Sequence, residues 1–488
     1  MHLIDLIPDI DKALAATSVT GVTADSREVS PGNIFVAIRG MSHDGHDHID
    51  AAIKAGAAAI VVEGDAAKQN IKTDIPVISM DNTRQALALI AARCHGRQPT
   101  SVIAVTGTNG KTSTVEFIRQ ICQRQGWRSA SIGTLGIRGD LPRDMNISGL
   151  TTPDAVHLHQ VLDQLSGHGV TTIAMEASSH GLDQFRLDGV RINAAGFTHL
   201  SRDHLDHHTD METYFAAKAR LFTEILGDGG VAVINIDCPW GRRLVEMITD
   251  RAVHIITCGH AEDADLRIID VTSHGVGMSV TAETDGMKYI LPLALNGTFQ
   301  ADNAILAAAM AHAGGMALDH ALLSLPYLQS APGRMHAIHG HPRGGIAVID
   351  YAHTPDALAT ALASLRPETD GQLGVVFGCG GDRDKGKRNE MGEVAARLAD
   401  FTIITDDNPR GEDPAEIRST IAAACPDAED IGNRRDAIAA GLNRLKQGDT
   451  LLIAGKGHET YQTIGSETLP FSDEATVRGL IASMGGSP

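Results

Sequence analysis

The segment from residue 102 to residue 114 constrains the fold more than any other part of the chain. Val102–Thr106 is an apolar, β-branched run, and it leads directly into a glycine turn that ends in Lys-Thr. The apolar positions after Thr112 then recur at helical spacing. A strand, a glycine loop and a helix in this order bring free backbone N–H groups and the positive end of a helix to one point. The segment therefore predicts an α/β fold with an anion-binding loop.

The residue types in this loop indicate a nucleotide. Gly107 and Gly110 let the backbone turn its N–H groups toward phosphate oxygens, Lys111 can reach the outer phosphates, and Thr112 can hold Mg²⁺. The loop is a variant, because Val105 stands where the usual pattern has glycine. A structural glycine turn is the alternative interpretation. The strand, the Lys-Thr pair and the amphipathic helix together favour ATP or GTP with magnesium.

Composition limits the class of protein. A chain of 488 residues exceeds one ordinary core, so we expect several domains. The 41 basic and 60 acidic residues give a net charge of −19, which argues against a nucleic-acid binder and favours small-molecule substrates. Six scattered cysteines suggest neither disulfides nor structural zinc. We find no targeting or membrane-spanning pattern, so we expect a monomeric cytoplasmic protein without membrane insertion.

The pattern of apolar runs divides the chain into three α/β units, at 1–98, 99–330 and 331–488. A strand-rich patch at Val253–Leu295 interrupts the second unit, and an alanine-rich helix is expected at Ala301–Ala313. The strands predicted in the three units are Asn33–Ile38, Ala58–Val62 and Ile75–Ile78; Val102–Thr106, Thr172–Met175 and Ile192–Phe197; and Gly345–Asp350, Leu373–Phe377, Phe401–Thr405 and Thr450–Ala454.

Two further strands of the second unit end in possible metal ligands. Glu176 follows Thr172–Met175, at the edge where a doubly wound sheet places its ligands. A surface or capping glutamate is the alternative. The histidine-rich segment His199–His208 follows the next strand and could hold zinc for hydrolysis. With a phosphate loop nearby, magnesium is the better interpretation, and most of these histidines are expected to be structural or solvated.

Lys218 lies on the apolar face of a helix predicted at Glu212–Leu226. A buried unpaired ammonium is costly, so such a lysine extends to solvent, finds a carboxylate or loses its proton. Spacing alone favours extension to solvent. A neutral amine could instead react with carbon dioxide, giving a carbamate whose oxygens could bind magnesium.

Three loops of the last unit combine glycine with charge, at Gly380–Lys385, Asp406–Pro414 and Gly455–Glu459. Arginine forks could bind carboxylates and a glutamate could bind an ammonium, so together the loops could hold a zwitterion. Each loop alone is an ordinary charged turn.

The ordered combination of motifs resembles the Mur ligases, in particular the branch that adds the third residue of the peptidoglycan stem peptide. The matching pieces, which span nearly the whole chain, are Asp25–Arg27 with Pro31-Gly32, Gly107–Thr112, Thr151–Pro153, Glu176–Arg186, Asp203–Asp206, Ala217-Lys218, Asn296-Gly297, Asn303, Pro332–Arg334, Asp350–Pro355 and the three charged loops.

The resemblance implies a UDP-binding domain, a central P-loop-type ATPase domain and a carboxy-terminal Rossmann-like domain that binds an amino acid. It also implies the reaction. ATP phosphorylates the D-glutamate γ-carboxylate of UDP-MurNAc-L-Ala-D-Glu, and the amine of meso-diaminopimelate then displaces phosphate. Diaminopimelate is lysine with one more carboxylate, for which Arg410 is the natural partner. In the family, the pattern found at Asp407–Arg410 marks the diaminopimelate-adding branch, whereas lysine-adding relatives lack the arginine.

The resemblance also implies site residues. The expected catalytic residues are Lys111, Glu176, His204 and Lys218, with Thr112, Glu176, His204 and carbamylated Lys218 (N6-carboxylysine) at Mg²⁺. The residues expected at ATP are Gly107, Thr108, Asn109, Gly110, Lys111, Thr112, Ser113, Asn303, Arg334 and Asp350. Those expected at the UDP-sugar dipeptide are Ser26, Thr151, Thr152, Ser178, Gln184 and Arg186. Those expected at diaminopimelate are Arg383, Asp407, Asn408, Pro409, Arg410, Gly455 and Glu459.

Other functions remain open on the sequence. The same ligation with L-lysine, or a ligase similar to folylpolyglutamate synthetase, is the nearest alternative. Residues up to 98, including Asp25–Arg27, argue against the folate ligase, as does Asp407–Arg410. A nucleotide-binding scaffold without turnover is disfavoured by the set of intact catalytic residues, and a zinc hydrolase built on His199–His208 is the third possibility.

Overall fold

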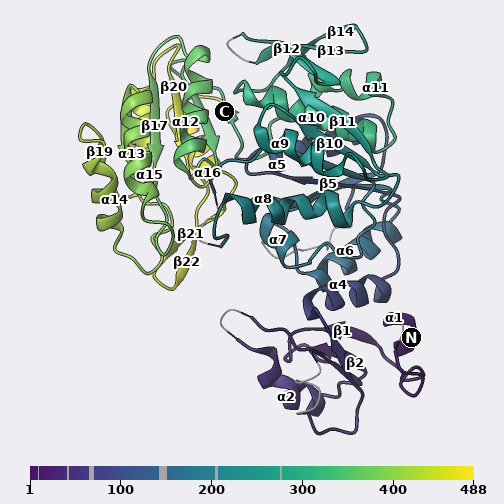
Figure 1. Cartoon of the computed structure of the whole chain (residues 1–488). Helices are drawn as coiled ribbons and strands as arrows, with labels where there is room; N and C mark the ends of the chain where they lie inside the picture. Colours follow the sequence, from purple (N-terminus) through teal and green to yellow (C-terminus); the bar gives the residue numbers. More distant parts are fainter. Residues whose placement is uncertain (9, 41–42, 65–70, 142–150, 204–206, 275–276) are drawn as a thin grey trace.

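Three mostly parallel sheets organise the chain, one in each of three successive units (Figure 1). The computed structural model describes residues 1–8, 10–40, 43–64, 71–141, 151–203, 207–274 and 277–488. The N-terminal unit lies at the lower end of the molecule in Figure 1, the central unit lies above it, and the C-terminal unit lies beside the central one. The three-unit α/β architecture predicted from the sequence is therefore confirmed.

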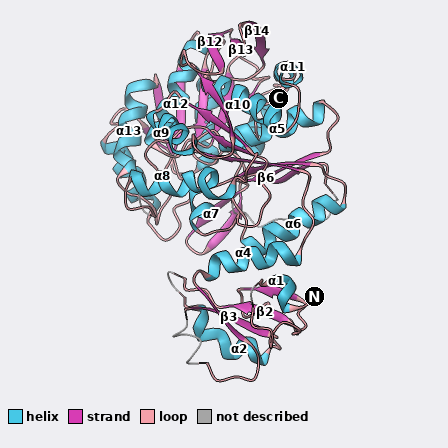
Figure 2. Cartoon of the chain, turned by 45° about the vertical axis from the view of Figure 1, so that its right-hand side comes forward, coloured by secondary structure: helices cyan, strands magenta, loops and turns pink. Residues whose placement is uncertain are grey.

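The N-terminal unit is a parallel sheet with apolar cores on both faces. Helix α4 lies between this sheet and α6 of the central unit, as Figure 2 shows. The Asn82 side chain caps α4 by accepting from the Gln85 N–H at 3.0 Å. Its elements are α1 (Leu3–Leu6), β1 (Gly21–Thr23), β2 (Asn33–Val36), η1 (Gly45–His48), α2 (Ile49–Lys54), β3 (Ala59–Glu63), β4 (Val77–Met80) and α4 (Thr83–Cys94).

The central sheet has the order β14-β13-β12-β11-β10-β9-β5-β8-β6-β7 in the described part of the chain. Strand β5 pairs in parallel with β8 and β9, and its apolar residues are buried on both faces. The predicted strand-rich patch forms the antiparallel end of the sheet. The strands are β5 (Ser101–Thr106), β6 (Ser129–Gly133), β7 (Gly136–Gly139), β8 (Thr172–Glu176), β9 (Ala194–Phe197), β10 (Val231–Asn235), β11 (His254–Gly259), β12 (Leu266–Ser273), β13 (Met278–Thr284) and β14 (Met287–Leu293).

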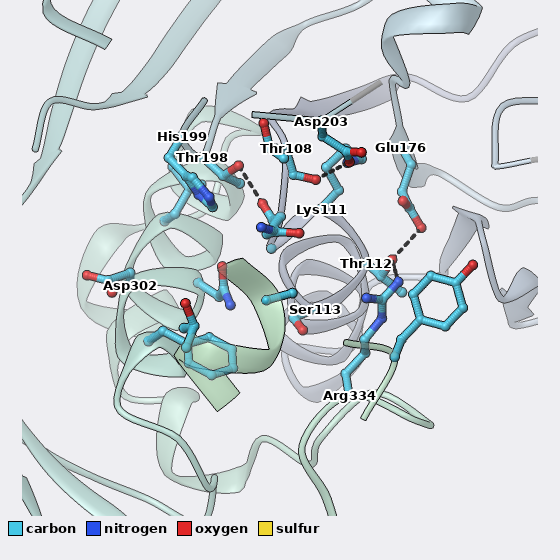
Figure 3. Close-up of a pocket in the computed structure, with 18 of the residues that line it drawn as sticks. Thr108, Lys111, Thr112, Ser113, Glu176, Thr198, His199, Asp203, Asp302 and Arg334 are labelled. Atoms are coloured by element: carbon cyan, nitrogen blue, oxygen red, sulfur yellow. Dashed lines mark hydrogen bonds between the residues drawn. The ribbon is translucent and has the colours of Figure 1, made fainter. Parts of the chain in front are cut away.

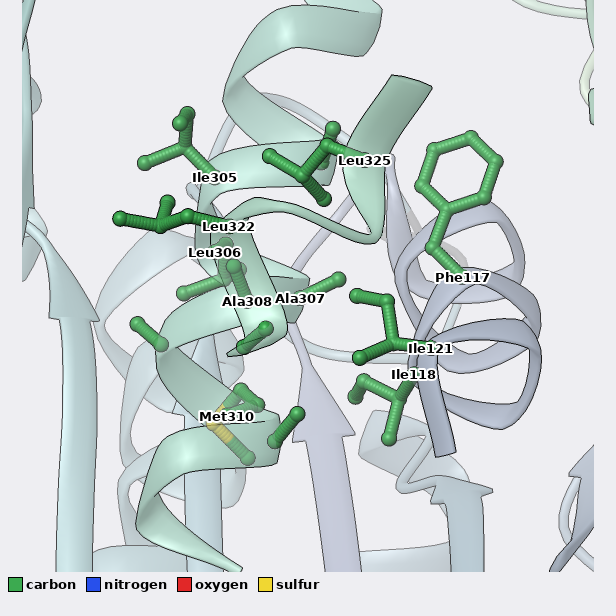
Figure 4. Close-up of a cluster of buried hydrophobic side chains, with 14 of the residues drawn as sticks. Phe117, Ile118, Ile121, Ile305, Leu306, Ala307, Ala308, Met310, Leu322 and Leu325 are labelled. Carbon is green, nitrogen blue, oxygen red and sulfur yellow. The ribbon is translucent and has the colours of Figure 1, made fainter. Parts of the chain in front are cut away.

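Two helices of the central unit, α5 and α10, pack closely against one face of this sheet. Ile118 and Ile121 of α5 (Lys111–Arg124) meet the alanine face of α10 (Phe299–Ala313) in one buried cluster (Figure 4). Small alanine side chains let the two helices approach each other, so the phosphate loop before α5 and the first turn of α10 are held as one rigid piece. The predicted helix at Ala301–Ala313 is confirmed and begins two residues earlier.

The helix that carries Lys218 differs from the prediction at its end. The α-helix α8 stops at Arg220, and the chain continues as a π-helix, η2 (Leu221–Ile225). Leu226 N donates to Leu221 O at 2.9 Å, which is the longer spacing of a π-turn. The remaining helices of the central unit are α6 (Ala155–Gly167), α7 (Ser179–Asp183), α8 (Met211–Arg220), α9 (Pro239–Ile248), α11 (Leu318–Leu322) and η3 (Leu325–Tyr327).

The C-terminal unit has a sheet ordered β15-β16-β20-β17-β18-β19, with antiparallel β15 at its edge and a separate hairpin, β21–β22. Buried clusters lie on both faces of the sheet. Its strands are β15 (His336–Ile338), β16 (Ile346–Asp350), β17 (Leu373–Phe377), β18 (Phe401–Ile404), β19 (Glu429–Asp430), β20 (Thr450–Ala454), β21 (Tyr461–Ile464) and β22 (Glu467–Pro470). Its helices are α12 (Pro355–Leu365), η4 (Arg366–Glu368), α13 (Lys387–Leu398), α14 (Pro414–Ala423), α15 (Arg434–Arg444) and α16 (Asp473–Ser483).

Most of the predicted strands are confirmed to within two residues at either end. In the parallel sheets, the strands carry their charged and glycine-rich loops at their carboxyl ends, which are therefore brought to common edges. Within the described residues, no helix is both long enough and apolar enough to span a bilayer.

Candidate active site

The loop between β5 and α5 has the backbone shape that its glycines predicted. Gly107 has φ +144° and Gly110 has φ +84°, both in the region that favours glycine. A Cβ at Gly107 would overlap the Thr198 hydroxyl, and one at Gly110 would overlap the Asn303 amide oxygen. Lys111 Nζ folds back over the loop and donates to Gly107 O at 2.9 Å and to Thr108 O at 2.7 Å. The loop is therefore tightly backed by other elements and keeps a cation at its centre.

The oxygen atoms of Thr112 and Glu176 beside this loop suit a magnesium ion. Thr112 Oγ1 donates to Glu176 Oε1 at 3.0 Å, and the Thr134 N–H and hydroxyl also donate to the Glu176 carboxylate, at 2.8 and 3.2 Å. Glu176 is almost fully buried, at 2% exposure. A buried carboxylate beside a threonine hydroxyl is the oxygen donor set that Mg²⁺ on a nucleotide prefers. The residues present therefore fit the predicted ion.

Lys218 is the second lysine at the same loop. Its side chain is 1% exposed, and Nζ donates to Gly107 O at 2.7 Å and lies 4.5 Å from the Tyr214 ring centre. Burial lowers the Lys218 pKa well below its usual range; Lys111 lowers it further and Asp203 opposes the shift. Extension of the side chain to solvent, which spacing favoured, is wrong, because the helix face packs fully into the core.

The histidine-rich segment is only partly described. His199 lines the cavity, and burial, with smaller contributions from Lys111 and Lys218, lowers its pKa to about 4, so it is neutral at physiological pH. His207 stacks on His180 with ring centres 4.0 Å apart. The predicted magnesium ligand His204 lies outside the described residues.

A cavity of about 460 Å³ joins this loop to the C-terminal unit (Figure 3). Arg334 Nη2 donates to Thr112 Oγ1 at 3.2 Å, and its guanidinium carbon lies 4.5 Å from the Tyr351 ring centre. Asp350 accepts from the N–H groups of Met335 and Ala352, each at 2.8 Å. Burial raises the Asp350 pKa, although the charge of Arg334 opposes the shift. Of the residues expected at ATP, those lining the cavity are Thr108, Asn109, Gly110, Lys111, Thr112, Ser113, Asn303, Arg334 and Asp350.

A network of hydroxyl groups lies beside Glu176. Thr152 Oγ1 donates to Glu176 O at 2.9 Å and lies 3.0 Å from Ser178 Oγ, while Thr151 accepts from the Thr134 hydroxyl at 3.2 Å. Arg186 donates to Thr152 O at 2.6 Å and to the Gln184 side chain at 2.7 Å. Five of the six residues expected at the sugar dipeptide are thus grouped. The sixth, Ser26, belongs to the N-terminal unit and does not line the cavity.

The charged loops of the C-terminal unit form one cluster. Asn408 Nδ2 donates to Glu459 Oε2 at 2.9 Å, and Arg410, at φ +49°, donates through Nη1 to Gly381 O at 2.9 Å. Gly455 N donates to Asp350 O at 3.2 Å, which joins this cluster to the cavity wall. Arg383 is exposed on its loop. The structure therefore gathers most of the residues expected at the amino acid.

The comparison with known proteins gives the family. The model for "Mur ligase family, catalytic domain" matches residues 18–95, "Mur ligase middle domain" matches 105–311, and "Mur ligase, glutamate ligase domain" matches 333–457. The chain belongs to the Mur ligase family. This result confirms the resemblance seen in the sequence.

Two full-length relatives of this Mur ligase carry the same name. Proteins of Bradyrhizobium diazoefficiens and Caulobacter vibrioides, each named UDP-N-acetylmuramoyl-L-alanyl-D-glutamate–2,6-diaminopimelate ligase, are 48% and 44% identical to the chain. The alignments cover 99% and 94% of both partners. A solved structure with the same name is 33% identical, with a TM-score of 0.74 over 100% of both chains. A Mycobacterium tuberculosis folylpolyglutamate synthase complexed with ADP and AMPPCP is 20% identical, with a TM-score of 0.62 over 76% of this chain and 92% of its own, and so shares the fold.

Several site residues of this Mur ligase were not singled out from the sequence. Thr134 holds the Glu176 carboxylate from a short turn with no motif, and Lys456 lies buried among the amino-acid loops. Asp237, His260 and Asp302 also line the cavity, with ligand atoms within 4.8 Å of one another, the one such metal-type group found in the part of the chain described. They come from three separate elements, so only the fold brings them together.

One glycine of the loop, Gly110, can be tested against a matched glycine outside the site. Gly110→Ala and Gly126→Ala both place alanine at positive φ, +84° and +77°, but Gly126 has no atom within 4 Å of the added Cβ. Both should lose about 1 kcal/mol of stability from backbone strain. Only Gly110→Ala forces Asn303 and the loop apart, so its ADP affinity, measured by calorimetry, should fall at least about tenfold, a change of about 1.4 kcal/mol. Equal affinities for the two variants would contradict this account of the loop.

Proposed function

We propose that the chain is an ATP-dependent ligase that joins meso-diaminopimelate to the D-glutamate γ-carboxylate of UDP-MurNAc-L-Ala-D-Glu, in peptidoglycan precursor synthesis. The observation that carries the proposal is the direct link between the two halves of the site. Asp350 lines the nucleotide cavity with its side chain and accepts from Gly455 of the amino-acid loops with its carbonyl. The shared name of full-length relatives at 44–48% identity supports the same reaction.

The chemistry follows from the charges of the cavity. A carboxylate is a poor electrophile, so ATP must first convert it to an acyl phosphate, with ADP as the leaving group. Lys111 offsets the negative charge of the phosphates and the attacking carboxylate, and Arg334 adds a second positive charge from the C-terminal unit. Mg²⁺ would be held by Thr112, Glu176 and His204, and would neutralise charge on the transferring phosphoryl group.

The second step uses the amino-acid loops. The ammonium of the incoming amino acid must lose a proton, after which its lone pair attacks the acyl carbon to give a tetrahedral intermediate. Collapse of that intermediate breaks the carbon–oxygen bond to phosphate, a second proton passes from the nitrogen to the departing inorganic phosphate, and the amide remains. Glu459 and Asn408 would hold an ammonium and a carboxylate of the substrate, while Arg410 would bind the extra carboxylate that distinguishes diaminopimelate from lysine. Arg383, Asp407, Pro409 and Gly455 complete the proposed amino-acid site.

Lys218 is proposed to act as a carbamate. Its buried amine has a depressed pKa, and a neutral amine is the form that reacts with carbon dioxide. The product, N6-carboxylysine, would replace a costly buried cation by an anion able to bind Mg²⁺ beside Glu176. The charge of Lys111 next to it favours that anion.

The sugar dipeptide is proposed to lie against the hydroxyl network of Thr151, Thr152 and Ser178, with Gln184 and Arg186 beside it. Ser26 would contact it from the N-terminal domain. We further propose domain limits at 1–98, 99–330 and 331–488, and a monomeric cytoplasmic enzyme.

The choice of amino acid tests the proposal. Phosphate release with ATP, Mg²⁺ and UDP-MurNAc-L-Ala-D-Glu should occur with meso-diaminopimelate and not with L-lysine. Arg410→Ala should weaken diaminopimelate use by about 2 kcal/mol or more in kcat/KM, because a charge contact is lost. Arg397→Ala, which changes an exposed arginine on α13, should leave it unchanged. Release with lysine alone would keep the ligase and refute the selector, and release with neither amino acid would refute the proposed reaction.

Carbamylation of Lys218 can be observed directly. Protein equilibrated with ¹³C-bicarbonate should show a carbamate carbon by NMR, and the signal should weaken toward acidic pH as the amine is protonated. Lys218→Ala should lack the signal and lose most activity, with partial rescue by a small carboxylic acid. Lys446→Ala, at an exposed lysine, is the control. A fully active Lys218→Ala without the carbamate signal would contradict the proposal.

A further inference from the structure

Lys456 is a fully buried lysine at the centre of the amino-acid loops. It follows β20, its side chain is 0% exposed, and its Nζ atom reaches three acceptors. Nζ lies 3.0 Å from Asn408 Oδ1, 2.9 Å from Glu459 Oε2 and 3.7 Å from Asp407 Oδ1. A buried ammonium is costly unless such partners surround it, so the burial of Lys456 depends on these three acceptors in the loops.

The Lys456 ammonium fixes the orientation of the Asn408 amide. Asn408 Oδ1 accepts from Lys456 and also from the Thr463 backbone N–H at 3.0 Å, so two donors require oxygen at that position. The amide nitrogen is thereby turned toward Glu459 Oε2, to which it donates at 2.9 Å. Without Lys456, one of the two donors that set this orientation is lost.

The same contacts extend to Arg410 through the hairpin β21–β22. Arg410 N donates to Thr463 O at 3.1 Å, and Gly465 N donates to Arg410 O at 2.7 Å. Gln462 Nε2 donates to Asp407 O at 2.6 Å. The hairpin therefore holds the backbone of the Asp407–Arg410 loop, and Asn408 is the side chain through which Lys456 joins that assembly.

The charges of the cluster leave it ready for a cation. Asp407 and Glu459 contribute two negative charges and Lys456 one positive charge, so the three together carry one negative charge, while the positive charge of nearby Arg410 is left for the extra substrate carboxylate. The neighbouring Arg434–Asp473 pair, joined at 2.7 Å with both side chains 0% exposed, is neutral. One ammonium from an amino acid would neutralise the cluster. Without Lys456, the carboxylates of buried Asp407 and partly buried Glu459 would lose the cation that both contact.

We propose that Lys456 is a positioning residue for the incoming amino acid: by holding Asn408 Oδ1 and Glu459 Oε2, it presents the Asn408 amide and the Glu459 carboxylate to the zwitterion. This inference rests on the proposed ligase function and deepens it. Lys456 itself, buried beneath its partners, acts through them rather than on the nucleotide or the acyl phosphate.

The test compares Lys456→Met, which removes charge and donor, with Lys456→Gln, which keeps an amide donor without the charge. Thr369→Val is the stability control. It removes buried hydrogen bonds to Leu365 O at 2.8 Å and Thr450 Oγ1 at 2.9 Å, at the opposite end of β20 from Gly455. Each variant is assayed for KM of diaminopimelate, KM of ATP, kcat and thermal midpoint. ADP binding by calorimetry shows that the nucleotide cavity remains folded.

A positioning role predicts a selective defect. Lys456→Met should raise the KM of diaminopimelate at least about twentyfold and Lys456→Gln at least about fivefold, while the KM of ATP stays within about twofold, because only the amino-acid loops lose order. Thr369→Val should lower the thermal midpoint without changing the KM of diaminopimelate. Adding Lys456→Met to Asn408→Ala should cost much less than adding it to the wild type, because the two residues act together.

Three outcomes would overturn the inference. One is a folded Lys456→Met or Lys456→Gln enzyme whose KM of diaminopimelate stays within about twofold of wild type. Another is an equal rise in the KM of ATP, which would indicate general damage. The third is full additivity with Asn408→Ala. If the wild-type enzyme itself fails to use diaminopimelate, the proposed function fails instead, so the two failures are distinguishable.

Discussion

Two lysine side chains converge on one carbonyl oxygen, and the rest of the site is arranged around them. Lys111 Nζ and Lys218 Nζ lie 2.9 and 2.7 Å from Gly107 O. Burial lowers the pKa of both amines, which reflects the cost of holding a charge in a low-dielectric core. Phosphate oxygens and a substrate carboxylate relieve that cost. The cavity is therefore preorganised for the anionic groups that the ligation brings together.

The C-terminal unit completes this electrostatic arrangement and connects it to amino-acid recognition. Arg334 brings a further positive charge to Thr112, and Asp350 links the cavity wall to Gly455. The amino-acid loops, in contrast, carry a negative excess suited to an ammonium. In the proposed reaction, the anionic acyl donor would therefore bind in the nucleotide half of the site and the cationic amine in the amino-acid half. The hydrogen bond from Gly455 N to Asp350 O connects the two halves of the site.

The sequence predicted the parts of the site that are local. Strand, loop and helix follow one another at Gly107–Thr112, so spacing alone identifies the phosphate loop, and Glu176 is marked by its place at the end of a strand. Asn303, Arg334 and Asp350 are distant in sequence, and only the family resemblance assigned them to the nucleotide. The spacing of these residues along the sequence cannot show that they lie together, because the packing of α10 and β16 is set by tertiary contacts.

Other residues show why local patterns fail. The spacing around Lys218 revealed an apolar helix face but could not tell how deeply the face is buried. Thr134 sits in a two-residue turn without a motif, although its N–H and hydroxyl both hold Glu176. Lys456 looks like a charged turn residue beside Glu459 until the fold brings Asn408 and Asp407 to it. In each case, burial and partners come from segments far along the chain.

The central claim is that this cavity activates a carboxylate by phosphorylating it. The most direct measurement uses UDP-MurNAc-L-Ala-D-Glu labelled with ¹⁸O in the γ-carboxylate, with ATP, Mg²⁺ and meso-diaminopimelate. Our account predicts that each amide formed transfers one labelled oxygen to the inorganic phosphate released, as detected by mass spectrometry. Product formation with unlabelled phosphate would contradict it, because the carboxylate oxygen would then never have been bonded to phosphorus.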